Sequence, residues 1–71
     1  MQNDVLAKTN KRQRIQMASK GENIEALIAK NEPEVIAKLI DYEYAQDHYE
    51  EWKSHEHGDV RYALACLGRF P

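Results

Sequence analysis

The sequence predicts an all-α fold, a short helical-repeat domain of about five helices in two and a half repeats. Three observations predict this class. Helix-capping signals recur along the chain, and apolar residues follow them at spacings of three and four. Strand signals are weak, because the chain has no long apolar/polar alternation and no Asn-Gly or Asp-Gly hairpin turn. Finally, segments of the chain resemble one another at offsets of 22 and 25 residues.

The first two helices are predicted from a cap, a glycine stop and an apolar stripe. Asn10 and Gln13 can form a capping box, in which each side chain bonds to the other residue's backbone N–H. Gly21 is expected to end the first helix in the left-handed conformation. Ile24 and Leu27 then begin the one-sided stripe of a second helix.

The third helix is predicted from the stretch "NEPE". Asn31 is the expected N-cap, Pro33 lies in the first turn where its missing N–H costs nothing, and Glu34 closes the box. Glu43 stands where the first helix has its terminal glycine. We therefore expect the third helix to run longer, to about Tyr44.

The last two helices are predicted from acidic starts. Asp47 and Glu50 form a further capping box, and Asp59 starts a final helix that Gly68 ends. Helices of about two to three turns do not persist alone in water, so tertiary packing must hold them. The expected core consists of Ile15, Ala18, Ile24, Leu27, Ile28, Val35, Leu39, Ile40, Tyr49, Trp52, Val60, Ala63 and Leu64.

The internal similarity joins the two ends of the chain. "RIQMASKG", which begins at Arg14, aligns with "RYALACLG", which begins at Arg61. Between them, "EVIAKLI" aligns with "DVRYALA", although Ile36 replaces the arginine. The copies start 22 and then 25 residues apart, a period typical of repeat architectures. An irregular helical bundle remains the alternative.

The stretch "DVRYALACLGRFP" resembles the unit of short HEAT-like repeats, including the leucine-rich-repeat-variant type. The resemblance covers about residues 12–71 and is strongest at Asp59-Val60-Arg61. It implies a right-handed α-solenoid used as a scaffold or binding surface. We expect one domain over residues 1–71, with residues 1–9 left open as a flexible N-terminal arm. Arg61 is expected to meet a carboxylate or a helix-end carbonyl of the middle copy.

Composition narrows the class of protein further. Of the 71 residues, 42% are hydrophobic and 31% charged, which is typical of a globular chain. Cys66 is the single cysteine, so no intrachain disulfide can form, which suits a reducing cytosol and a cytoplasmic location. No apolar run approaches the ~20 residues that span a bilayer. Residues 1–31 carry a net charge of +3, and residues 32–71 carry −5.

No residue pattern predicts catalysis, a metal or a cofactor. His48, His55 and His57 gather near one polar turn, but they lack the His-Glu-x-x-His spacing of zinc enzymes and no cysteine pair supports them. Cys66 lies in the apolar stripe of the last helix, where a buried structural thiol is expected rather than a nucleophile. We therefore expect a non-enzyme.

The C-terminal residues predict a surface through which a non-catalytic module would bind a partner. The last unit lacks the second helix of the earlier units, so an apolar edge is expected at Tyr62, Cys66, Leu67 and Phe70. We expect a protein partner or a second copy of the chain to cover it, most simply in a two-fold homodimer. The other explanation is that the chain is a fragment whose next helix is missing.

A second hypothesis is nucleic-acid binding through a basic N-terminal helix. Its candidate residues are Lys8, Lys11, Arg12, Arg14 and Lys20. Such side chains bind phosphates, but no aromatic residue interleaves them for base stacking, and the chain is acidic overall. Arg14 also occupies the repeat position of Arg61, for which we expect a structural role.

Overall fold

The computed structural model describes residues 6–68, and this part of the chain is helical without any strand. It contains five α-helices and one 3-10 turn, η1, which precedes the fourth helix. In order, the elements are α1 (Lys11–Lys20), α2 (Ile24–Lys30), α3 (Pro33–Asp41), η1 (Gln46–His48), α4 (Tyr49–Trp52) and α5 (Gly58–Leu67). The predicted all-α class and the five helices are confirmed.

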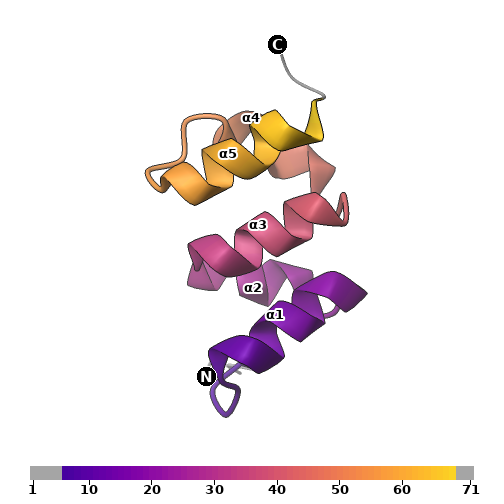
Figure 1. The fold of residues 1–71 in the computed structure, drawn as a ribbon. Helices are drawn as coiled ribbons and strands as arrows, with labels where there is room; N and C mark the ends of the chain where they lie inside the picture. Colours follow the sequence, from indigo (N-terminus) through magenta and orange to yellow (C-terminus); the bar gives the residue numbers. More distant parts are fainter. Residues whose placement is uncertain (1–5, 69–71) are drawn as a thin grey trace.

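The helices lie in two layers. Helices α1, α3 and α5 are side by side and run in the same direction, with α3 packed between the other two (Figure 1). Helix α2 packs against α1 and α3, and α4 packs against α5, so these short helices form the second layer. The central helix α3 is consequently the one most enclosed by others.

Each of the three long helices is followed, within two residues, by a residue in the left-handed conformation. Gly21, Glu43 and Gly68 all have left-handed φ values, of 73°, 61° and 73°. The backbone N–H of each donates to the carbonyl three residues earlier, at 2.9–3.2 Å. The expected extension of the third helix to Tyr44 is wrong, because Glu43 adopts the conformation that glycine adopts in the other two helices.

The helix starts match the predictions only in part. The capping box of Asn10 and Gln13 is confirmed, with N···O distances of 2.8 and 2.9 Å. The N-cap of α3 is Glu32 instead of Asn31, because Asn31 adopts a left-handed conformation that ends α2. Asp47 forms no capping box, since the chain enters α4 through a 3-10 turn.

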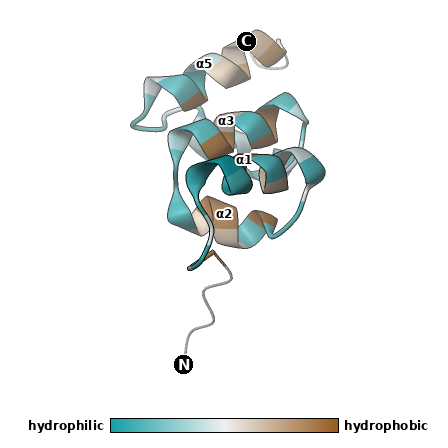
Figure 2. Ribbon diagram, turned by 60° about the horizontal axis from the view of Figure 1, so that its bottom comes forward, coloured by the Kyte–Doolittle hydropathy of each residue, from teal (hydrophilic) through white to brown (hydrophobic). Residues whose placement is uncertain are grey.

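The core follows the predicted stripes, with two additions. All the predicted core residues are buried except Ile15, Ile24 and Ile28, which are partly buried against it. Ile36 is fully buried and Leu6 is 3% exposed, and neither was predicted. The apolar segments of α2 and α3 contrast with the hydrophilic start of α1 (Figure 2).

Leu6, within the stretch left open as an N-terminal arm, is buried in the core. Thr9 donates from its backbone N–H and its hydroxyl to the Leu6 carbonyl, at 3.1 and 2.7 Å. Residues 6–9 therefore fold against the domain, and only residues 1–5 of the expected arm lie outside the described part.

Candidate interaction surface

The histidines are held by neighbouring protein groups. His48 stacks on Trp52 with ring centroids 5.4 Å apart, and its Nδ1 lies 3.4 Å from a carboxylate oxygen of Glu51. His55 uses both ring nitrogens, at 2.8 Å from Asn31 Oδ1 and at 3.0 Å from the backbone N–H of His57. Among residues 6–68, no three His, Cys, Asp or Glu side chains gather as a metal site would require.

Arg14 has a structural role. Its guanidinium donates two hydrogen bonds to the Glu32 carboxylate, at 2.5 and 2.9 Å, and two to the carbonyl and hydroxyl of Thr9. The side chains of Arg14 and Glu32 are only 11% and 19% exposed. Hydrogen bonds from Arg14 hold the pKa of Glu32 below its usual value. The pair therefore ties the start of α1 to the start of α3.

Of the other basic residues predicted for nucleic-acid binding, one forms an ion pair and three are exposed to solvent. Lys11 Nζ lies 3.3 Å from Glu34 Oε2. The pKa of Glu34 is lowered chiefly by a backbone hydrogen bond and next by this contact with Lys11. Lys8, Arg12 and Lys20 are exposed. Two of the five cations are thus matched by carboxylates.

Arg61 meets the expectation for its repeat position only in part. One of its guanidinium nitrogens donates to the backbone carbonyl of His55, which lies in the turn between α4 and α5. Arg14 makes the corresponding bond to Thr9, in the turn before α1. Arg61 is exposed and meets a turn carbonyl, so the expected enclosure of its side chain and the expected helix-end acceptor are wrong.

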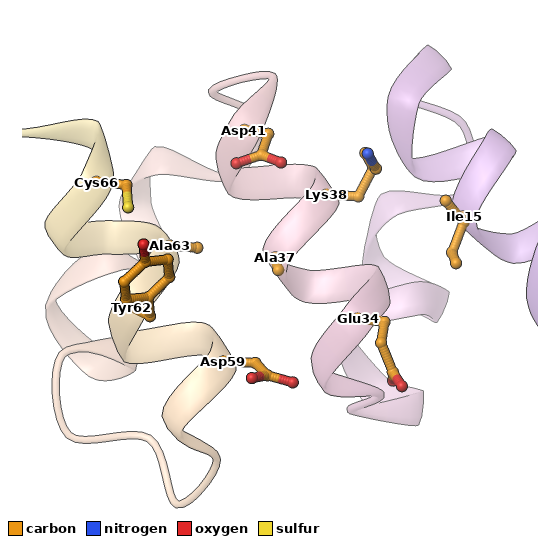
Figure 3. Close-up of a pocket in the computed structure, with 9 residues that line it drawn as sticks. All are labelled: Ile15, Glu34, Ala37, Lys38, Asp41, Asp59, Tyr62, Ala63 and Cys66. Carbon is orange, nitrogen blue, oxygen red and sulfur yellow. The ribbon is translucent and has the colours of Figure 1, made fainter.

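The predicted apolar edge does not form as one surface within the described residues. Tyr62 is 72% exposed and Cys66 is exposed, so the expectation of a buried thiol is wrong. Leu67 instead packs partly against the core. Phe70 lies outside the described residues. The reason is geometric, because Tyr62 and Cys66 turn sideways toward α3 instead of toward the end of the layer (Figure 3).

A groove of about 470 Å³ lies over the layer of α1, α3 and α5. Figure 3 shows Tyr62 and Cys66 on one side, Ile15 on the other and Ala37 between them. A hydrogen bond with the Cys66 thiol raises the pKa of Tyr62. The complete described lining is Ile15, Glu34, Ala37, Lys38, Asp41, Asp59, Tyr62, Ala63 and Cys66.

The groove was not predicted, although the sequence carried a signal for it. The lining residues of α3 lie at positions 34, 37, 38 and 41, which is one face of a helix. Those of α5 lie at 59, 62, 63 and 66, each 25 residues later. Applying the repeat offset to exposed positions as well as to core positions would have aligned these two faces.

Comparison with protein-family models, with curated proteins and with solved structures finds no match to the chain. None of the helices within residues 6–68 has the length and apolar character that crossing a membrane requires.

Proposed function

We propose that the chain is a non-catalytic helical-repeat module that binds a protein partner, or a second copy of itself, through the groove over α1, α3 and α5. One observation carries the proposal. Tyr62 exposes 72% of its surface at an open groove whose floor is made of alanine side chains. Tyrosine is enriched at protein interfaces because its ring offers a large apolar area at little conformational cost.

The spacing of the elements supports a HEAT-like solenoid arrangement. The N-cap residues of the three long helices are Asn10, Glu32 and His57, which lie 22 and then 25 residues apart. The left-handed residues that end these helices have the same two spacings. Solenoids of this kind offer extended surfaces of parallel helices to their partners.

The chemistry of the groove favours binding over catalysis. Its polar lining comprises carboxylates, one lysine, the Tyr62 hydroxyl and the Cys66 thiol. A thiol nucleophile requires an adjacent base or a lowered pKa, and no histidine lies among these lining residues. The carboxylates instead supply a charged rim around an apolar floor, which is the usual composition of an interface.

Two exposed tyrosines allow a matched test. We expect Tyr62→Ser to weaken self-association in sedimentation velocity, or to reduce the protein retained in a pull-down, relative to the wild-type chain. Tyr42→Ser is the control, because Tyr42 is 54% exposed but lies outside the groove. The proposal fails if the wild-type chain neither associates nor retains a partner, or if both variants behave alike.

A further inference from the structure

The groove carries a charge pattern that selects among protein partners. Its described lining holds three carboxylates, from Glu34, Asp41 and Asp59, against one lysine, Lys38. Glu34 is already paired with Lys11. Within residues 6–68, Asp41 and Asp59 form no ion pair. Two carboxylates of the rim are therefore open to cations of a partner.

These two carboxylates lie at opposite ends of the groove. Asp59 is in the first turn of α5, at the level of Glu34 on α3, whereas Asp41 is the last residue of α3 (Figure 3). Asp41 lies seven positions after Glu34, which is about 10 Å along the helix axis. The carbonyl end of α3 adds negative potential beside Asp41, which also favours a cation there.

The middle of the groove is apolar and shallow. Ala37 on α3 and Ala63 on α5 form its floor, because their small side chains leave space that larger residues would fill. Ile15 and the ring of Tyr62 form its walls. A partner segment with an apolar side chain between two cations would therefore place the apolar side chain on the alanine floor and one cation beside the carboxylate at each end.

We propose that the groove binds a basic amphipathic helix, with cations seven positions apart and an apolar residue between them. This proposal rests on the proposed function and specifies its partner. Two helical turns span about 10 Å, which matches the separation of the carboxylates along the groove. An apolar residue at the third or fourth position between the cations lies on the same face of the helix and would enter the alanine floor.

The experiment uses a labelled helical peptide with Arg at positions i and i+7 and Leu at i+3 and i+4. The matched control peptide has Glu in place of Arg. Anisotropy titrations of the full chain should show binding of the basic peptide that weakens as salt is added. Asp41→Asn and Asp59→Asn should each weaken it about two- to fivefold. Asp47→Asn, an exposed acid outside the groove, should leave it unchanged.

Two outcomes would overturn the inference. One is equal binding of the acidic and basic peptides, and the other is indifference to Asp41→Asn and Asp59→Asn. Self-association or partner retention that still depends on Tyr62 would then preserve the proposed function while excluding a basic helix as its partner. Circular dichroism of each variant checks that the helical fold is unchanged.

Discussion

The glycines that end α1 and α5 permit a test of how the turns after these helices are built. Gly21 and Gly68 have the same φ of 73°, but their surroundings differ. A Cβ atom at Gly21 would lie 2.8 Å from Cε1 and Cζ of the Tyr44 ring, whereas at Gly68 no atom of the described residues lies within 4 Å. Gly21→Ala therefore combines backbone strain with a steric clash, and Gly68→Ala introduces the backbone strain alone.

The two substitutions should differ in their effect on the free energy of unfolding. A non-glycine residue in the left-handed conformation costs about 1–2 kcal/mol, and alanine recovers about 0.4–1 kcal/mol by restricting the unfolded chain. Gly68→Ala should therefore destabilise the domain by about 1 kcal/mol. At Gly21 the ring of Tyr44 must also shift, and overpacking of this kind costs about 1–3 kcal/mol more.

Urea unfolding followed by circular dichroism measures both values. In a Tyr44→Ala background the clash is absent, so Gly21→Ala should then cost about as much as Gly68→Ala. Equal costs for the two glycine variants in the wild-type background would refute the close approach of Tyr44 to Gly21.

Four further changes test other parts of the domain. Glu43→Gly should stabilise it by about 0.5–1 kcal/mol in urea unfolding, because glycine relieves the left-handed strain at φ 61°; a loss of stability would contradict this. Leu39→Ala, at a fully buried site, should cost about 2–5 kcal/mol and leave a chain of this size largely unfolded, so a near-wild-type melting curve would show that the core is misassigned. Arg14→Met should cost about 1–3 kcal/mol at pH 7. Because Arg14 lowers the pKa of Glu32, the stabilisation is present above the ordinary value of 4.5 and is lost as pH falls through the lowered value. The difference between the wild-type chain and the Met variant should therefore narrow in acid, where only the Arg14 hydrogen bonds to Thr9 remain; a constant difference in urea unfolding across pH would contradict the pair. Ala37→Leu should fill the groove and abolish binding of the basic peptide while the melting temperature stays near the wild-type value; undiminished binding would show that the peptide docks elsewhere.

The sequence was most informative where one residue type has one local role. The capping box of Asn10 and the glycine stops at Gly21 and Gly68 were predicted correctly because each depends on backbone geometry within a few residues. It was less informative where one residue could serve two helices. Asn31 stands between α2 and α3, and either the end of one or the start of the other could use it.

Tertiary packing explains the remaining errors in the core. Ile36 was aligned with the partly buried Arg14 and the exposed Arg61, but α3 has a neighbour on both sides, so the same position is fully buried there. The burial of Leu6 accompanies a turn that the side chains of Thr9 and Arg14 hold through hydrogen bonds to backbone carbonyls. Neither effect can be read from the spacing of apolar residues alone.

The groove arises where equivalent positions of the three long helices differ in size. Ile15, Ala37 and Tyr62 lie 22 and then 25 residues apart, so they occupy one row across the layer. The core row beside it stays uniformly bulky, with Leu39 and Leu64 buried. A small residue between two large ones makes a hollow, and the hollow is open because this row faces away from α2 and α4. The regular spacing that builds the core therefore also sets the position of the groove, whereas the side chains along the row set its depth.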